Sequence, residues 1–262
     1  MSPWWNKFFK RPCDVLITSR EIVLSQGEQI IAAAELPASA AGDTLEARIG
    51  QTLETVLKQV PGVKDHSASI WLSHSLVPHS VVEMDARAMS ESAISSALKA
   101  YWEDTLNRPA EKLALTYQVQ PRGRSIFSSC CDLVLLDAIQ AALQGAGWTP
   151  ASISPHLAKT WNEGRKQIRN EDCFLLVLQD KVLSIGMRRD GQWIAWTSEG
   201  CDSVEWAELA IRTTRFSRST GLSDGQSRPV WIHAPQAVGK PRSAGLSNWF
   251  LLNAAPDTES RA

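Results

Sequence analysis

The sequence predicts an α/β protein built of two related lobes. Three short strands, a helix and a further strand are indicated near the start of the chain, and the same order recurs after Cys173. The length of 262 residues is enough for one large domain or two modest ones with real cores. Hydrophobic residues make up 44% and charged residues 21%, which is typical of a globular chain rather than a disordered one.

Composition and charge exclude several classes of protein. A net charge of −1 gives no general basic surface, so nucleic-acid binding is not expected. The five cysteines include the adjacent pair Cys130-Cys131 and no C-x-x-C spacing, which disfavours a disulfide framework or a zinc ribbon and suits a reducing compartment. No apolar run approaches the roughly 20 residues that span a bilayer, and Met1 to Arg11 lacks the apolar core of a signal peptide. We therefore expect a cytoplasmic protein.

The first half of the chain alternates between strand and helix patterns. Asp43-Thr44 can begin a helix whose apolar residues recur at steps of three and four, and Pro61-Gly62 can end it. Ser90 can cap a second helix. The predicted elements, in chain order, are strands at 13–17, 20–24 and 29–35, a helix at 45–60, a strand at 69–73 paired with one at 78–84, a helix from Ser90 to about Leu106, a strand at 113–120 with a hairpin partner at 126–129, and a helix at 132–143.

The second half repeats the opening order. Ile153-Ser154-Pro155 is predicted to open a helix that continues through Leu157 and Trp161, since proline suits a first helical turn. Arg189-Asp190-Gly191 is a good hairpin turn because glycine tolerates positive φ. The remaining predicted elements are strands at 174–178, 182–188 and 192–197, a helix at 203–216, a strand at 229–233, and a polar stretch from Pro241 that ends in a frayed tail at 254–262.

The stretch from Phe8 to Leu24 is the most informative in the chain. A short aromatic and basic lead-in runs into a buried strand, a tight turn at Thr18-Ser19-Arg20 and a second strand. This arrangement resembles the opening of PilM, the actin-like protein of type IV pilus assembly, and of the cytoplasmic domain of GspL from type II secretion. In that family an acidic residue and then a glycine usually occupy the turn, whereas here Leu16 and Thr18 stand at those positions. Glycine lets backbone N–H groups approach a phosphate and a carboxylate holds the waters of Mg²⁺, so the resemblance implies a fold that has lost this chemistry.

The resemblance covers roughly residues 8 to 235 in element order and implies a particular fold. That fold is actin-like (ribonuclease-H-like), duplicated and two-lobed, with mixed sheets. It implies a first lobe at 12–129 and a second at 130–245. A segment at 1–11 precedes them, and a tail at 246–262 follows them.

Two further loops that surround ATP in actin-like ATPases also depart from the family pattern. The turn at 178–182 contains Asp180 but no glycine. After the strand end at 231–235, the next glycine is Gly239, which lies further along the chain than the family's glycine pair. These losses imply a protein with no nucleotide cofactor and no catalytic activity. The alternative left open is an active actin-like ATPase or small-molecule kinase that uses Ser19, Arg20 and Asp180 in an unusual site.

Two other motifs have simpler interpretations. Ser96 and Lys99 match the S-x-x-K motif of penicillin-binding enzymes, but no K-T-G or S-D-N triplet accompanies them, which favours a solvated helix face. His66, His74 and His79 fall within fourteen residues, in or beside polar turns, where a zinc site would want three or four converging ligands. We expect scattered surface histidines and no metal site.

The N-terminal segment is predicted to be a short amphipathic helix, since Ser2 can cap it and Pro3 can begin it. Such a helix suits a membrane headgroup layer or a groove on a partner, and it can equally fold back onto its own lobe. Its aromatic face would carry Trp4, Trp5, Phe8 and Phe9, and its other face Asn6, Lys7, Lys10 and Arg11.

The resemblance also implies a function. Proteins of this type act as cytoplasmic adaptors in the inner-membrane assembly platform of a pilus or secretion machine. The implied partner is the cytoplasmic tail of a bitopic inner-membrane protein, held as an extended peptide, with an assembly ATPase as a further partner. We therefore expect a non-catalytic adaptor at the inner face of the inner membrane, with peripheral membrane contact as an additional possibility.

Overall fold

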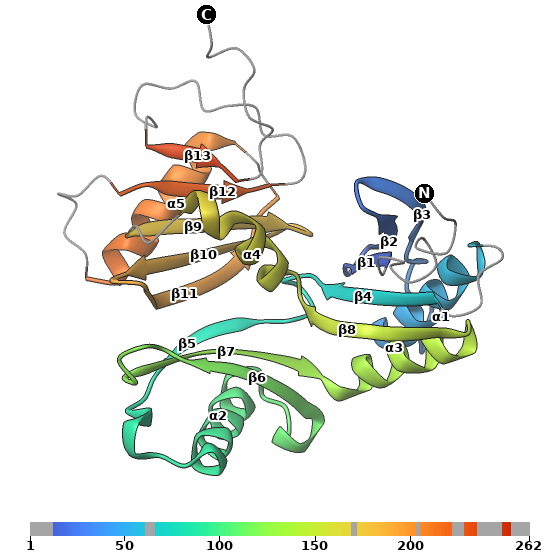
Figure 1. Ribbon diagram of the computed structural model, residues 1–262, viewed down its shortest axis with the longest axis horizontal. Coiled ribbons are helices and arrows are strands. Elements are labelled where there is room, and N and C mark those ends of the chain that lie inside the picture. The colour runs from blue at the N-terminus through green and yellow to red at the C-terminus, as the bar shows by residue number, and fades with distance from the viewer. Residues whose placement is uncertain are drawn as a thin grey trace, which may run out of the picture. The chain divides into compact units, whose positions relative to one another are not determined.

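The computed structural model describes residues 13–60, 66–168, 172–202, 205–221, 228–234 and 248–252 (Figure 1). The chain divides into two compact units. Unit 1 comprises Met1–Val77, Arg108–Ala114 and Cys131–His156, and unit 2 comprises Pro78–Asn107, Leu115–Cys130 and Leu157–Ala262. No helix within the described ranges combines the length and the apolar composition needed to cross a bilayer.

Unit 1 is built on a five-stranded mixed sheet in the order β3-β2-β1-β4-β8. β1 (Cys13–Ile17), β2 (Glu21–Gln26) and β3 (Gln29–Glu35) form the antiparallel meander that the sequence predicts. β4 (His66–Leu72) lies parallel to β1, and β8 (Trp148–Pro155) lies parallel to β4. Parallel neighbours require long crossover connections, and helices of unit 1 lie within them.

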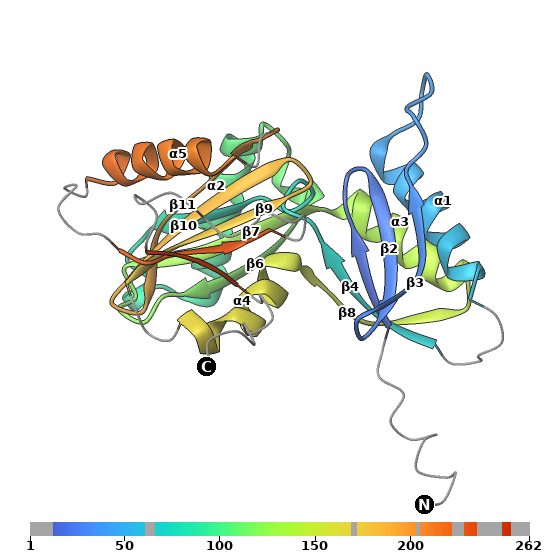
Figure 2. The ribbon, with the colours of Figure 1, turned by 90° about the horizontal axis from the view of Figure 1, so that it is seen from above.

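Two helices of unit 1, α1 (Leu45–Lys58) and α3 (Leu133–Gly145), lie on one side of this sheet (Figure 2). α1 begins where predicted because Thr44 Oγ1 accepts a hydrogen bond from the Ala47 N–H at 3.2 Å. A Cβ built on Gly50 of α1 would lie 3.4 Å from the carbonyl oxygen of Ala138 in α3, which is an ordinary van der Waals distance, so the two helices are in contact at this point. Their apolar faces and the inward residues of the strands make the core of unit 1.

Unit 2 contains a second five-stranded sheet with the corresponding strand order, β11-β10-β9-β12-β13. β9 (Cys173–Gln179), β10 (Val182–Arg189) and β11 (Gln192–Gly200) form an antiparallel meander, and β12 (Val230–His233) lies parallel to β9. β13 (Trp249–Leu251) adds parallel to β12. The meander, helix and parallel strand therefore occur twice in the chain, as the sequence predicts.

Both faces of the second sheet are covered within unit 2 (Figure 2). α5 (Trp206–Ser219) packs on one face through Leu209 and Phe216. α4 (His156–Ile168) lies on the other face, where Trp161 joins a cluster of tryptophan rings from the strands. The cluster fits closely, because a Cβ on Gly186 of β10 would lie 2.2 Å from Cζ3 of Trp196.

Unit 2 also contains a three-stranded sheet in the order β5-β7-β6, formed by β5 (His79–Glu83), β7 (Ser125–Asp132) and β6 (Leu113–Val119). α2 (Glu91–Leu106) begins at the predicted cap, Ser90, and packs on this sheet through a small apolar cluster. Trp102 is anchored there by a 2.9 Å hydrogen bond from its indole Nε1 to Ser128 Oγ.

Three sequence predictions about elements are wrong. The strand at 78–84 does not pair with 69–73, because β4 already has β1 and β8 as neighbours, and β5 pairs instead with β7. Ile153-Ser154-Pro155 ends strand β8 rather than opening a helix, and α4 starts only after Pro155, since a residue before proline is biased towards extended backbone. β13 lies in the stretch predicted to be polar, where three residues are too few to show a periodicity.

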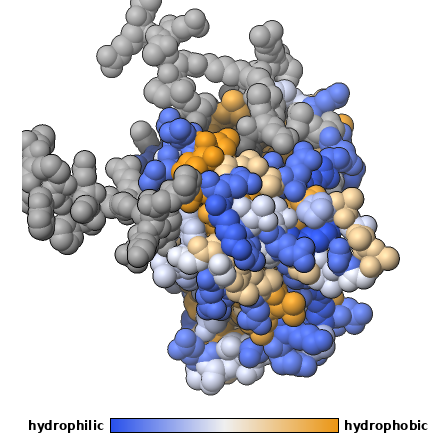
Figure 3. Space-filling model, turned by 90° about the vertical axis from the view of Figure 1, so that its right-hand side faces the viewer, coloured by the Kyte–Doolittle hydropathy of each residue, from blue (hydrophilic) through white to orange (hydrophobic). Residues whose placement is uncertain are grey.

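The hydropathy of the molecular surface is that expected of a chain whose apolar residues are mostly buried. On the side shown in Figure 3, hydrophilic residues predominate and hydrophobic residues form small areas among them. Ser96 and Lys99 lie exposed on α2, as predicted from their helical spacing. The predicted lobe boundaries at 12–129 and 130–245 remain a prediction.

Candidate functional site

The turn between β1 and β2 is closed by the side chain of Thr18. Its hydroxyl oxygen accepts hydrogen bonds from the backbone N–H groups of Arg20 at 3.1 Å and Glu21 at 2.9 Å. The same hydroxyl donates to the carbonyl oxygen of Glu21 at 3.0 Å, and the Thr18 N–H donates to that oxygen as well. Thr18 itself is only 4% exposed, whereas Arg20 beside it is exposed, so these bonds lie at the edge of the buried interior.

This geometry has a direct chemical consequence. A turn that binds phosphate offers backbone N–H groups to the anion, usually with glycine at the point of closest approach. Here the N–H groups of Arg20 and Glu21 are directed at a threonine oxygen instead. A phosphate at this turn would have to replace bonds that the folded chain already makes.

The carboxylate nearest in sequence on β1 is also engaged. Leu16 stands where the resemblance places an acidic residue, and it is half-buried between Val23 of β2 and Trp71 of β4 in the strand register. Asp14 lies two residues earlier on the same face of β1. Its Oδ1 accepts a 2.8 Å hydrogen bond from the indole Nε1 of Trp71, so this carboxylate helps to hold β1 and β4 together.

The corresponding turn of unit 2, between β9 and β10, is a tight two-residue hairpin. Asp180 and Lys181 have φ values of 54° and 57°, and Gln179 pairs directly with Val182. The Lys181 carbonyl oxygen accepts a hydrogen bond from the Cys201 N–H at 2.8 Å. A hairpin this short has no room for the glycine-rich loop that would wrap a phosphate.

Gln179, the last residue of β9, is a feature that sequence reasoning missed. Its side chain is 6% exposed, and neither its amide nitrogen nor its amide oxygen has a hydrogen-bond partner among the described residues. A buried amide of this kind is costly unless it is paired, and amide groups of glutamine are suited to hydrogen-bond a ligand. Only its position at the end of a predicted strand could have drawn attention to it.

The histidines differ from the prediction of scattered surface residues, which is wrong for two of them. His74 is 3% exposed in the turn after β4, and His79 is 7% exposed at the start of β5. His79 Nδ1 lies 2.6 Å from Ser129 Oγ, and burial lowers the pKa of His79 from 6.5 to about 3. The side chain of His66 lies outside the described residues. Among those described, no group of three or more histidine, cysteine or acidic side chains is placed to hold a metal ion.

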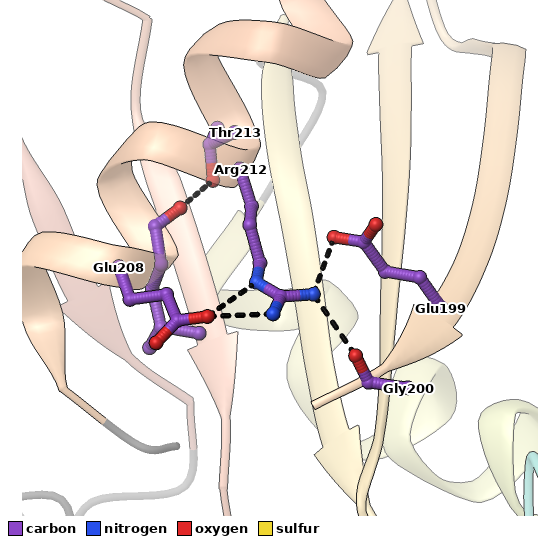
Figure 4. Close-up of polar contacts among 6 residues, drawn as sticks. Glu199, Gly200, Glu208, Arg212 and Thr213 are labelled. Atoms are coloured by element: carbon purple, nitrogen blue, oxygen red, sulfur yellow. Dashed lines mark hydrogen bonds and ion pairs between the residues drawn. The ribbon is translucent and has the colours of Figure 1, made fainter. Parts of the chain in front are cut away.

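A polar network in unit 2 is a second feature that the sequence did not suggest as a site (Figure 4). Arg212 of α5 bonds Glu208 one turn earlier at 2.6 Å and also reaches Glu199 of β11 at 2.9 Å. Its Nη1 donates to the Gly200 carbonyl oxygen at 2.9 Å. The guanidinium therefore ties the exposed end of β11 to α5, which is a structural role. The four-residue spacing of Glu208 and Arg212 could have predicted the ion pair between these two residues, but not the one with Glu199.

Comparisons with known proteins identify the fold to which this architecture belongs. No protein-family model matches the chain, and no curated protein matches it by sequence. The PilM–PilN type IV pilus biogenesis complex is similar with a TM-score of 0.59 and 13% identity, over 93% of this chain and 88% of that one. A protein with an actin-like ATPase fold and unknown function from Bacteroides thetaiotaomicron gives a TM-score of 0.56 and 8% identity, over 97% and 94%. The fold is actin-like.

A third similar structure is the cytoplasmic domain of EpsL, an inner membrane component of the type II secretion system of Vibrio cholerae. It has a TM-score of 0.52 and 13% identity, over 84% of this chain and 80% of that one. The predicted resemblance in fold to PilM and to the GspL cytoplasmic domain is confirmed. Identities of 8 to 13% establish shared architecture rather than shared chemistry.

Within this actin-like fold, the residues proposed for an unusual nucleotide site lie at two different turns. Ser19 and Arg20 follow Thr18 in unit 1, with Ser19 half-buried and Arg20 exposed. Asp180 lies in the β9–β10 hairpin of unit 2. The strand β12 ends at His233 as predicted, whereas the loop around Gly239 lies outside the described residues.

The predicted partner- or membrane-binding residues also lie outside the described residues. They are Trp4, Trp5, Lys7, Phe8, Phe9, Lys10 and Arg11, and they remain a prediction from sequence.

Proposed function

We propose that this actin-like protein is a non-catalytic adaptor in the inner-membrane assembly platform of a type IV pilus or type II secretion-like machine. The observation that carries the proposal is the turn closed by Thr18, whose hydroxyl occupies the backbone N–H groups that an ATPase would offer to phosphate. The fold itself supports the same class, since the PilM–PilN complex and the EpsL cytoplasmic domain have similar structures.

The proposed partner is the cytoplasmic tail of a bitopic inner-membrane protein, and the proposed location is the cytoplasmic side of the inner membrane. An extended peptide would gain affinity from edge-strand pairing and specificity from apolar pockets. The test uses synthetic peptides that match the cytoplasmic tails of bitopic proteins encoded beside this chain, titrated into the full chain by calorimetry. Saturable binding of one tail, and not of a scrambled peptide, is expected. No binding by any tail would contradict the partner.

Calorimetric titration with Mg·ATP tests the absence of nucleotide chemistry. We expect no binding at millimolar ATP, because the Thr18 hydroxyl already accepts the N–H groups of its own turn and the β9–β10 hairpin is too short to wrap a phosphate. Micromolar binding that disappears in Ser19→Ala and Asp180→Ala would overturn the adaptor proposal and establish an active site.

The second candidate function is therefore an actin-like ATPase or small-molecule kinase with a divergent site. The specific observation that favours it is the buried, unpaired amide of Gln179 next to Asp180. Gln179→Leu separates the two functions. It should abolish ligand binding if the amide contacts a ligand, and it should leave stability unchanged or raised if the amide has no partner in any state.

Peripheral membrane contact by the N-terminal segment is a further proposal. Sedimentation with anionic vesicles of the full chain against a chain that starts at Cys13 measures it. Greater partitioning of the full chain is expected from the aromatic and cationic side chains, and equal partitioning would remove the proposal.

A further inference from the structure

The two five-stranded sheets differ in how their second faces are covered. Every residue of β9 is buried, because α5 covers one face of its sheet and α4 the other. In β1, the central strand of the unit 1 sheet, Cys13, Val15 and Ile17 are buried but Asp14 and Leu16 are only half-buried. Both α1 and α3 lie on the face of Val15 and Ile17. In the part of unit 1 that is described, no helix lies on the face of Leu16.

We call the side of the unit 1 sheet opposite α1 and α3 the second face. The strand register sorts its side chains into rows across the sheet. One row is apolar, and an acidic pair and a polar row flank it. The apolar row is Ala33, Val23, Leu16 and Trp71; the acidic pair is Glu35 and Glu21; and the polar row is Ser25, Asp14 and Ser69.

This pattern fits one kind of occupant. The apolar row is partly exposed, with Leu16, Val23 and Trp71 half-buried and Ala33 exposed. Burying it would require an apolar helix face about as wide as the row. The flanking carboxylates would favour a helix with cations beside that apolar face and no acidic residue of its own.

The chain's own N-terminal segment has these properties. Residues 2–11 carry four aromatic side chains, three cations and no acidic residue. A ten-residue helix is about 15 Å long, at roughly 1.5 Å per residue. The segment joins the sheet directly, since only Pro12 separates it from Cys13, the first residue of β1. Leu16 is three strand steps from Cys13, about 10 Å, so the apolar row is within its reach.

The other end of the chain does not offer an alternative. Residues 253–262 contain alanine, proline and polar side chains but no large apolar one. A segment of that composition could not bury the apolar row.

We propose that residues 2–11 dock in cis on the second face of the unit 1 sheet, with their aromatic side chains on the apolar row and their cations beside Asp14, Glu21 and Glu35. The docked segment would cover the second face of the unit 1 sheet, as α4 covers one face of the five-stranded sheet of unit 2. The same aromatic side chains cannot contact the sheet and a partner or membrane at once. Docking is therefore the state of the free chain, and engagement of a partner or membrane by this segment requires its release.

Site-specific photo-cross-linking in the full chain tests the proposal. p-Benzoylphenylalanine replaces Ala33 or Val23 on the second face, and it replaces Gln51, an exposed residue of α1, as the matched control. Ala33 is exposed, so its variant should fold even if that of Val23 does not. Mass spectrometry then maps cross-links to residues 2–11. An equimolar mixture of ¹⁵N-labelled and unlabelled chains separates cross-links within a chain from those between chains.

The expected result is a cross-link within one chain from Ala33 or Val23 to residues 2–11, several-fold above the yield from Gln51. Reversing the three cations, with Lys7→Glu, Lys10→Glu and Arg11→Glu together, should lower that yield several-fold at low salt. Equal yields from the second face and from Gln51 would overturn the proposal. Cross-links found only between labelled and unlabelled chains would also overturn it and would identify a second copy as the occupant.

Discussion

Replacing Thr18 by valine tests whether one hydroxyl closes the β1–β2 turn. Valine keeps the shape and β-branching but removes an oxygen that accepts two backbone N–H groups and donates to the Glu21 carbonyl. A hydrogen bond contributes about 1 kcal/mol net, and an unpaired buried group costs more. The exposed Arg20 N–H can regain water, which offsets part of the loss. The three bonds therefore predict a destabilisation of about 2–3 kcal/mol.

Urea unfolding followed by circular dichroism measures this change. With a slope of about 2–3 kcal/mol per molar urea, the midpoint should fall by roughly 1 M. The control is Thr116→Val, since Thr116 is an exposed threonine on β6 and should change stability by less than about 0.5 kcal/mol. If Thr18→Val unfolds at the same midpoint as Thr116→Val, the Thr18 hydroxyl does not stabilise the turn. The argument that this hydroxyl keeps the N–H groups of the turn from a phosphate would then be wrong.

Three other perturbations probe unit 2. Gly186→Ala should lower stability by about 1–3 kcal/mol in thermal unfolding, because its Cβ would lie 2.2 Å from a ring carbon of Trp196. Burial lowers the pKa of His79 from 6.5 to about 3, so below pH 6.5 the unfolded chain binds a proton that the folded chain excludes. The unfolding free energy should thus fall by about 2–3 kcal/mol on going from pH 7 to pH 4.5 in urea titrations. Arg212→Leu should cost about 1 kcal/mol, and less in high salt, because it removes partly exposed ion pairs.

Each of these has a matched control. Gly200→Ala adds a Cβ with nothing within 4 Å, so an equal loss in both alanine variants would contradict the packing argument at Gly186. His79→Gln should reduce the fall of the unfolding free energy between pH 7 and pH 4.5. If that fall is the same in the variant, groups other than His79 cause it. Arg215→Leu changes an exposed arginine on the same helix, and a loss as large as that of Arg212→Leu would remove the special role of Arg212.

The sequence alone was enough for most of the elements and for the suspicion about the nucleotide site. Strands and helices with strong periodicity, such as β1 and α1, lie where predicted because alternation and helical spacing are local properties. Position 18 holds threonine where the resemblance leads us to expect glycine, and this difference can be read from the sequence alone. What the threonine does instead, by accepting two N–H groups, depends on a turn geometry that no single-residue pattern encodes.

Only the tertiary structure decided which strands pair and which side chains are buried. The sequence predicts the wrong partner for β5, because pairing depends on which strands already lie on the two sides of β4. The sequence predicts a surface position for His79, because the aromatic rings that bury it belong to residues distant in sequence, Phe127 and Trp196. The sequence by itself determined the repeated order of strands and helices, since that order follows from local hydrophobic spacing. The unequal covering of the two sheets emerged only from the fold, because burial is set by what packs across a face rather than along a strand.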